Sequence, residues 1–219
     1  MTEWFGAATD ITERRRHDER QRLLVHELNH RVKNTLAIVQ SMAMQTLREC
    51  DDIALAAERF ESRLHALSQA HDMLTRTRWE DASLEDIVRV AIAPCVQQET
   101  DRFEIGGGRV DLDPQRALAL TMALHELCTN AMKYGALSTP EGRVRIRWSC
   151  SEEEGHRHLM LRWEEQDGPP VVPPTRRGFG SRLIERGLRH DLGGEVSLDF
   201  ALAGVVCRID VPLAREVDL

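Results

Sequence analysis

No proline or glycine interrupts the stretch from Thr12 to about Glu49. Along it, apolar or small residues recur every three or four positions, which predicts one long helix with a heptad-like seam. The seam residues are Leu24, Leu28, Val32, Thr35, Val39, Met42 and Thr46. A second apolar stripe predicts another helix from about Asp52 to Thr75, and two long helices joined by a short link predict an antiparallel hairpin. Because one hairpin exposes its seam, we expect a dimer that completes a four-helix bundle. A monomer stays open if the seam packs on the rest of the chain.

The composition limits the class of protein. The chain has 219 residues, 42% of them hydrophobic, which is enough for one sizeable core and a smaller unit. It has no apolar run of 18 residues, so we expect no membrane span, and we expect no signal peptide. A net charge of −7 and an aromatic content of 5% argue against general nucleic-acid binding. The cysteines form no CxxC pair or His/Cys cluster, so we expect reduced thiols in a cytoplasmic protein. They are Cys50, Cys95, Cys128, Cys150 and Cys207.

A third helical run begins near Pro114 and ends in the stretch from His125 to Ala136. Within it, Glu126, Asn130 and Lys133 are spaced at i, i+4 and i+7 and therefore share one face, away from the apolar stripe. A carboxylate and an amide oxygen one turn apart can hold Mg²⁺, directly or through its waters, and a lysine suits a phosphate. The alternative is an ordinary amphipathic helix whose polar edge is only solvated.

The rest of the chain predicts short elements separated by turns. A short helix is expected over 84–96, and short strands over 102–105 and 110–112 flank Gly106, Gly107 and Gly108, which we interpret as a hairpin turn. The further strands are expected at 144–148, 158–164, 195–200 and 205–211.

His30 lies on the first long helix, off its apolar seam, within the stretch from His26 to Asn34. An ordinary histidine pKa of about 6.5 leaves the imidazole mostly neutral near pH 7, so a ring nitrogen can act as a nucleophile. Glu27 and Asn34 lie about one turn away and could orient the ring or take its proton, so the general base stays open. The alternative is a surface histidine on a coiled coil, which is how we interpret His26, His65 and His71.

Two motifs follow the third helix. Trp163-Glu164-Glu165 ends a predicted strand just before Gly168. Further on, Gly178-Phe179-Gly180 precedes a predicted helix over 182–191. Glycine allows backbone to approach a phosphate closely, and a helix N-terminus points amide donors at it. A single Gly-x-Gly is weak evidence, and its position after the other motifs is what makes it informative.

In this order, the motifs resemble those of the HWE histidine kinases. The stretch from His125 to Ala136 resembles the N-box of the ATPase fold that sensor histidine kinases share with gyrase and Hsp90. The stretch 26–34 resembles the phosphoacceptor box, Trp163 to Glu165 the Trp-x-Glu motif, and 178–181 the G2-box. The resemblance implies an α+β chain, with an antiparallel helical hairpin over 12–76 and an α/β-sandwich ATP-binding domain over 80–215.

The resemblance also implies roles for single residues. His30 would accept the γ-phosphoryl group of ATP, Asn130 would hold Mg²⁺, and Glu165 would accept a hydrogen bond from the adenine amino group. The implied nucleotide-binding residues are Glu126, Asn130, Lys133, Tyr134, Glu165, Gly168, Arg177, Gly178 and Gly180. The chain departs from the family at Asp167, where glycine is usual. It also departs from better-known kinase classes at Arg31, where an acid usually follows the acceptor.

The implied partners are a response regulator, whose aspartate would receive the phosphoryl group, and an upstream sensor, because residues 1–11 resemble the end of a PAS domain. Two other functions stay open. One is an ATP-binding scaffold with little turnover, which the departures at Asp167 and Arg31 allow. The other is a serine kinase of the anti-sigma type. The predicted hairpin, with His30 inside a phosphoacceptor-like motif, argues against this function. Whether phosphorylation occurs within or between subunits is not decided by the sequence.

Overall fold

The computed structural model describes residues 12–49, 52–76, 81–96, 100–153, 156–171 and 188–213. The chain divides into two compact units, Met1–Gln45 and Thr46–Leu219. Helix α1 (Thr12–Glu49) spans this division, and α2 (Ile53–Arg76) belongs to the second unit. These bounds confirm the two predicted helices, whereas their pairing as a hairpin and the dimer stay predictions. None of the described helices has the length and hydrophobicity needed to cross a bilayer.

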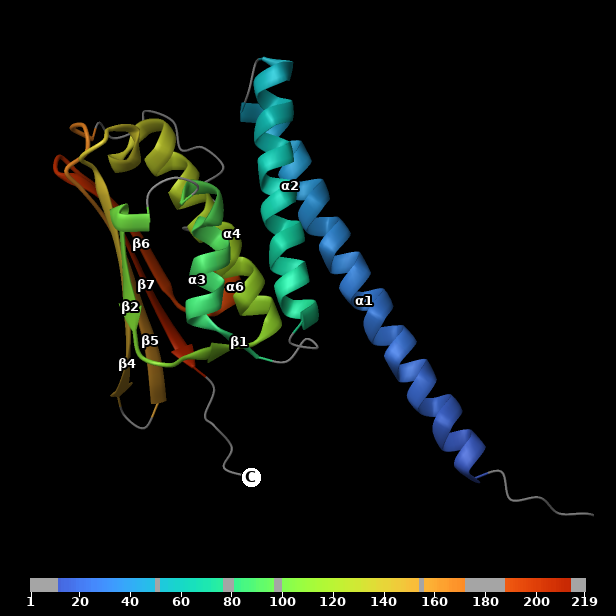
Figure 1. Ribbon diagram of the computed structural model, residues 1–219. Helices are drawn as coiled ribbons and strands as arrows, with labels where there is room; N and C mark the ends of the chain where they lie inside the picture. Colours follow the sequence, from blue (N-terminus) through green and yellow to red (C-terminus); the bar gives the residue numbers. More distant parts are fainter. Residues whose placement is uncertain are drawn as a thin grey trace, which may run out of the picture. The chain divides into compact units, whose positions relative to one another are not determined.

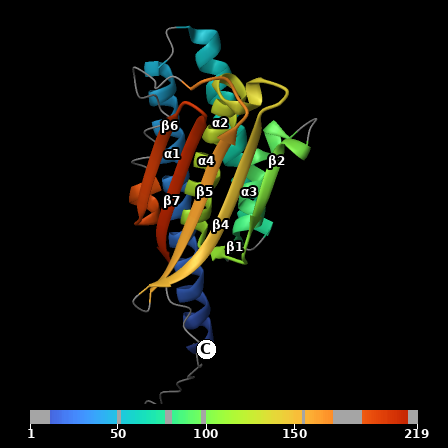
Figure 2. The same cartoon turned by 90° about the vertical axis from the view of Figure 1, so that its left-hand side faces the viewer.

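The second unit is built on a five-stranded sheet with the order β2-β4-β5-β7-β6 (Figure 2). The strands are β2 (Phe103–Gly107), β4 (Arg143–Glu153), β5 (His156–Gln166), β6 (Glu195–Ala201) and β7 (Gly204–Leu213). Strand β2 runs parallel to β4, and the other neighbours are antiparallel. The four strands expected after the third helix are therefore confirmed; β6 and β7 are slightly longer than predicted, and β4 and β5 considerably longer.

The predicted glycine hairpin is wrong. Gly106 and Gly107 lie inside β2, and the next strand, β3 (Asp111–Leu112), pairs with β1 (Ala82–Ser83) instead of with β2. A Cβ atom at Gly107 would lie 2.4 Å from the ring of Trp148, its partner in the neighbouring strand. Trp148 Nε1 also donates a hydrogen bond to the Gly108 carbonyl at 2.7 Å. The glycines therefore make room for a large ring beside the edge strand rather than forming a turn.

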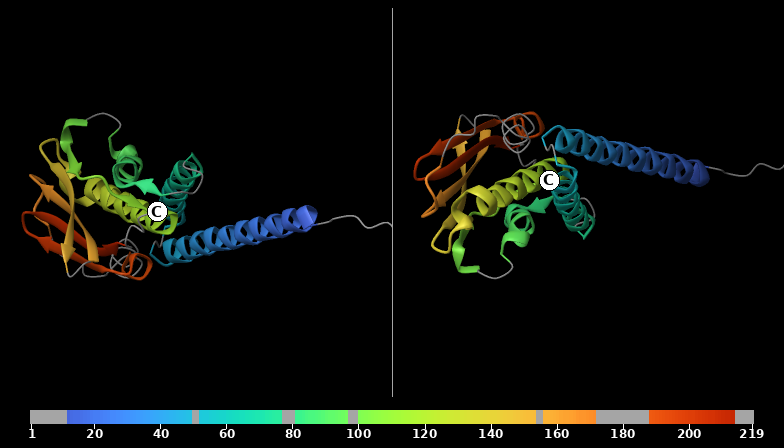
Figure 3. Two further views of the ribbon diagram at one scale, coloured as in Figure 1. Left: turned by 90° about the horizontal axis from the view of Figure 1, so that it is seen from below. Right: turned by 90° about the horizontal axis from the view of Figure 1, so that it is seen from above.

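One face of the sheet is covered by α3 (Leu84–Ile92), α4 (Pro114–Tyr134) and α6 (Leu188–Leu192) (Figure 1). Helix α4 lies between the sheet and α2, against which it packs (Figure 3). It begins as the sequence predicts, because Asp113 Oδ1 accepts hydrogen bonds from the backbone N–H groups of Gln115 and Arg116, both at 3.0 Å. Short 3₁₀ turns complete the unit at Ala93–Cys95, Thr100–Arg102 and Ala136–Ser138.

The core of the second unit forms where α3 and α4 meet alternate side chains of the central strands. Its fully buried large members include Leu84, Ile87, Leu120, Leu124, Ile146, Leu159, Leu161 and Trp163. Eleven of the 21 residues of α4 are buried, so this helix is the centre of the unit and its position is set by packing on both sides.

The expectation that all five cysteines are reduced thiols is wrong for one pair. Cys95 and Cys128 form a disulfide, with their Cα atoms 6.4 Å apart. Cys95 ends the 3₁₀ turn that follows α3, and Cys128 is buried in α4, so the bond joins two packed helices. Sequence spacing did not indicate it, because the packing of α3 on α4 brings together residues separated by 33 positions. Cys150 and Cys207 are free.

Candidate functional site

The C-terminal half of α4 carries a cluster of the predicted nucleotide-binding residues. Glu126, Asn130, Lys133 and Tyr134 all line one small cavity of about 60 Å³. Their helical spacing puts them on one side of α4, as predicted. Glu126 is buried, with 4% of its surface exposed, whereas Asn130, Lys133 and Tyr134 are exposed.

Helix α2 supplies the other wall of this cavity, through Arg59, Ser62 and Arg63. Arg63 Nε lies 2.5 Å from Glu126 Oε1, and Arg63 Nη2 lies 3.2 Å from Glu126 Oε2. Sequence reasoning missed these residues, because Arg63 and Glu126 are 63 positions apart. The available signal was the charged Arg63 beside the apolar stripe of a helix, at a position where the structure leaves only 6% of it exposed.

The histidine that precedes Glu126 is buried against α2. His125 is 2% exposed, and its Nε2 lies 3.3 Å from Ser62 Oγ. Burial lowers the pKa of the His125 imidazole below its ordinary value, although the neighbouring Glu126 opposes the shift. His125 is therefore a neutral hydrogen-bonding group near pH 7 and contributes no charge to the cavity.

The cluster fits a magnesium ion only in part. Mg²⁺ prefers oxygen ligands, and Asn130 presents an amide oxygen at the exposed edge of the cavity. Glu126 does not fit in this conformation, because both of its carboxylate oxygens accept hydrogen bonds from Arg63. Within the described ranges, no group of three or more His, Cys, Asp or Glu residues is placed to hold a metal ion.

A second cluster surrounds the loop that follows α4. Glu165, on β5, is 4% exposed, and its Oε2 accepts a hydrogen bond from the Ala136 N–H at 2.9 Å. Burial raises the pKa of the Glu165 carboxyl, and the bond from Ala136 opposes that shift. A Cβ atom at Gly168 would lie 2.5 Å from the Ala136 Cα. The structure thus brings Glu165 and Gly168, both predicted for the nucleotide, to the loop that extends the first cluster.

The departure at Asp167 has a structural consequence. Its φ angle of 56° is in the left-handed region, and it is the only non-glycine residue with positive φ among those the structure describes. Aspartate tolerates this region better than most residues but less well than glycine. The backbone turn expected of glycine is therefore formed here by aspartate.

Some predicted site residues cannot be placed. Arg177, Gly178 and Gly180 lie outside the described residues. His30 lies in α1, where the backbone is helical as predicted, but its side chain is outside the described part of the chain. His30 also belongs to the first unit and the two clusters to the second. Its role as the acceptor therefore stays a prediction.

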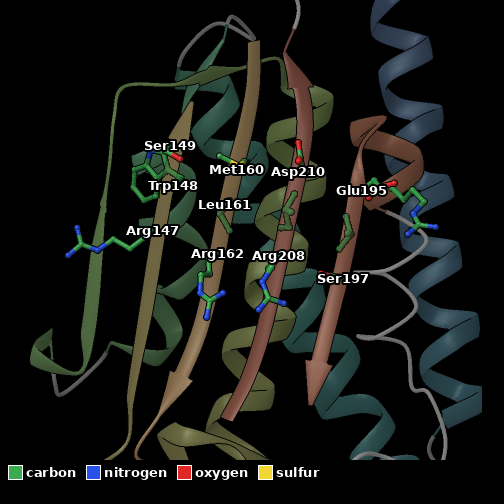
Figure 4. A pocket seen from close by; sticks show the side chains of 13 residues that line it. Arg147, Trp148, Ser149, Met160, Leu161, Arg162, Glu195, Ser197, Arg208 and Asp210 are labelled. Carbon is green, nitrogen blue, oxygen red and sulfur yellow. The ribbon is translucent and has the colours of Figure 1, made fainter. Parts of the chain in front are cut away.

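A larger cavity of about 610 Å³ lies on the face of the sheet opposite the helices (Figure 4), and no predicted site residue lines it. Arg147, Arg162 and Arg208 form one row across β4, β5 and β7. Acidic neighbours offset this charge, because Arg147 pairs with Glu104 and Arg162 Nε lies 3.0 Å from Glu164. The chemistry predicted from the sequence is thus gathered on α4 and its loop rather than here.

Two family descriptions match the sequence. Residues 27–109 match "HWE histidine kinase", and residues 100–193 match "Histidine kinase-like ATPase domain". The blue-light-activated histidine kinase of Brucella ovis is 39% identical over 213 residues, which are 97% of this chain and 44% of that protein. The corresponding protein of Brucella anthropi is 40% identical over 97% of this chain and 43% of its own length. The chain therefore spans less than half the length of these relatives.

Solved structures show the same fold. The Erythrobacter litoralis EL346 blue-light activated histidine kinase superposes with a TM-score of 0.60 at 22% identity, over 97% of this chain and 63% of that one. The histidine kinase domain of the same protein gives a TM-score of 0.53 at 19% identity, over 83% of this chain and 94% of that one. With the two family matches covering residues 27–193 between them, the chain belongs to the HWE family of histidine kinases.

Proposed function

We propose that this chain binds Mg-ATP in its second unit and transfers the γ-phosphoryl group to a ring nitrogen of His30. The observation that carries the proposal is the gathering of Glu126, Asn130, Lys133 and Tyr134 around one cavity on α4, in a chain of the HWE family. The nearby Glu165 carboxylate and Gly168 are suited to the adenine end of the nucleotide.

The reaction needs positioning and charge neutralisation more than covalent chemistry from the protein. A neutral nitrogen of His30 attacks the γ-phosphorus, an N–P bond forms, and the bond to the β,γ-bridging oxygen breaks to release ADP. The proton of the ring leaves to solvent or to a nearby base. Lys133 contributes a positive charge near the phosphates, and Asn130 an oxygen for the metal. Bound Mg²⁺ would offset the negative charge of the phosphate oxygens.

The later steps belong to the same proposal. The phosphoryl group of His30 would pass to an aspartate of a response regulator, and an upstream sensor, a homodimer and a cytoplasmic location would accompany this role. Family membership supports each of these. The Brucella relatives are named as activated by blue light, and this chain spans only part of them.

Incubation with ATP labelled in its γ-phosphate tests the proposal. We expect label on the protein that is labile in acid and stable in base, and that is lost in His30→Ala but kept in the control His26→Ala. Acid-stable label would indicate a serine kinase instead. A chain that binds ATP but takes up no label would be a nucleotide-binding scaffold, the function that the pairing of Glu126 with Arg63 favours as second candidate.

A further inference from the structure

The buried ion pair between Arg63 and Glu126 occupies the predicted metal-binding face of α4. Its two hydrogen bonds, at 2.5 and 3.2 Å, use both carboxylate oxygens, and the side chains are only 7% and 6% exposed. Two parallel bonds of this kind form the geometry that guanidinium and carboxylate groups prefer. Both oxygens of this buried carboxylate are already bonded to a cationic group, which disfavours the approach of a metal ion or of its water ligands.

Arg63 has a third partner on another helix. Its Nη1 donates a hydrogen bond to Thr46 Oγ1 at 2.6 Å, and Thr46 is 1% exposed. Thr46 lies on α1, the same helix that carries His30, which comes between four and five turns earlier in the sequence. One guanidinium therefore joins α1, α2 and α4, and we call Arg63 with Thr46 and Glu126 the Arg63 bridge.

Helix α2 also engages the rim of the cluster. Arg59 Nη2 donates a hydrogen bond to the hydroxyl of Tyr134 at 3.0 Å, and Lys133 Nζ lies 3.7 Å from Glu58 Oε1. The cavity left between α2 and α4 measures about 60 Å³, well below the roughly 300 Å³ at which small-molecule sites begin. Helix α2 thus covers the Glu126 end of the face of α4 that is predicted to hold Mg-nucleotide, whereas Asn130, Lys133 and Tyr134 stay exposed.

We propose that the Arg63 bridge is an autoinhibitory contact, in which the guanidinium of Arg63 takes the place of the metal cation at Glu126. The inference rests on the proposed function and adds to it a mode of regulation. Opening α2 breaks the two bonds between Arg63 and Glu126, and a cation that binds the freed carboxylate offsets this loss. The incoming cation replaces the guanidinium, so closure of α2 and binding of Mg-nucleotide exclude each other. By linkage, any change in α1 that weakens the bond to Thr46 favours the nucleotide-competent state.

Hydrogen exchange on the intact chain tests this directly. With Mg²⁺ and a non-hydrolysable ATP analogue, the backbone amides of α2 around Arg63 should exchange faster, while those of α3 keep their protection. Calorimetry on the same samples measures whether the analogue binds. Binding of the analogue with unchanged or increased protection of α2 would overturn the bridge and leave the kinase proposal standing.

Substitutions give a second measurement. Arg63→Met keeps the apolar stem and removes the charge, so we expect Mg-ATP to bind about tenfold more tightly. The control Arg89→Met, which breaks an exposed pair with Glu85 on α3, should not change the affinity. Because Arg63→Met leaves the Glu126 carboxylate without its cationic partner, Thr46→Val provides a milder change. It removes one hydrogen bond to Arg63 and keeps the shape of the side chain at position 46. We expect Thr46→Val to tighten Mg-ATP binding by about threefold, which is less than in Arg63→Met because only one bond of the bridge is lost.

The outcomes separate the two proposals. Tighter binding in both variants supports the bridge. Nucleotide affinity that falls or stays the same in folded Arg63→Met and Thr46→Val overturns it. If the analogue binds to neither the wild-type chain nor the two variants, the proposed function fails together with the bridge.

Discussion

The Glu165 carboxylate of β5 accepts a hydrogen bond from the backbone N–H of Ala136, at 2.9 Å, in the loop that follows α4. Its other oxygen lies 3.4 Å from Trp163 Nε1. One buried carboxylate thus fixes the loop that extends the candidate nucleotide cluster. A carboxylate has about four acceptor positions, so this one can hold the loop and still accept a bond from an adenine amino group.

Replacing Glu165 by glutamine should weaken ATP binding with little change in the fold. The amide oxygen can still accept the bond from Ala136, whereas the amide nitrogen would present a donor to the adenine amino group. We expect a loss of about tenfold in ATP affinity and a reduced preference for ATP over GTP. Calorimetric titration measures both. The neighbouring variant Glu164→Gln, at a side chain paired with Arg162, is the control, and an unchanged ATP preference in Glu165→Gln would remove the adenine assignment.

The same residue should give the fold a specific pH dependence. Burial raises the pKa of Glu165 in the folded chain above the 4.5 of an exposed glutamate, so the folded state keeps a proton that the unfolded state releases. This stabilising contribution is complete below pH 4.5 and is lost as the pH rises through the folded-state pKa. Urea unfolding of the wild-type chain and Glu165→Gln at several pH values isolates the effect, because the opposite contribution of His125 is common to both. Parallel stability curves would contradict the prediction.

Gly135 should not tolerate a side chain. A Cβ atom there would lie 2.0 Å from Glu165 Oε2 and 3.0 Å from the Ala131 Cα. Because the carboxylate is fixed by Ala136, we expect Gly135→Ala to lower the free energy of unfolding by about 1–3 kcal/mol. The matched control is Gly108→Ala, where a Cβ atom meets nothing within 4 Å and the change should stay below about 0.5 kcal/mol. If chemical denaturation gives the same change in the free energy of unfolding for Gly135→Ala and Gly108→Ala, the chain relieves the clash at position 135 and the prediction is wrong.

Asp167→Gly should stabilise the chain. At φ 56°, aspartate carries a steric cost that glycine avoids, partly offset by the greater freedom of glycine in the unfolded state. We expect a net gain of about 0.5 kcal/mol in the free energy of unfolding. The same change at Asp199, an exposed residue in β6, should cost about 0.5–1 kcal/mol. A loss of stability in Asp167→Gly would mean that the aspartate makes a compensating contact.

Asn130→Ala should abolish labelling from ATP without affecting the fold. Asn130 is exposed, so its removal leaves no cavity, yet it is the amide oxygen proposed for the metal. Thermal unfolding followed by circular dichroism should match that of the wild-type chain. Met132→Ala, at an exposed position on the same helix, should keep the label. Full labelling of Asn130→Ala would exclude the metal assignment.

Local patterns in the sequence predicted most elements correctly. The cap at Asp113 and Pro114 at the first turn located the start of α4, and Arg143–Glu153 and His156–Gln166 form the predicted pair of strands. The spacing of Glu126, Asn130 and Lys133 was sufficient to place them on one side of that helix. Such features depend on residues within a few positions of one another, where backbone geometry alone relates sequence to structure.

Contacts between distant residues were decided only by the tertiary structure. The partner of Glu126 is an arginine 63 positions earlier, the glycines at 106 and 107 pack beside Trp148, and Cys95 meets Cys128 across two helices. In each case the determining interaction is the burial of one element against another, which no local period encodes. The sequence by itself therefore determined which side chains α4 presents on this side, whereas packing decided that α2 buries Glu126 among them.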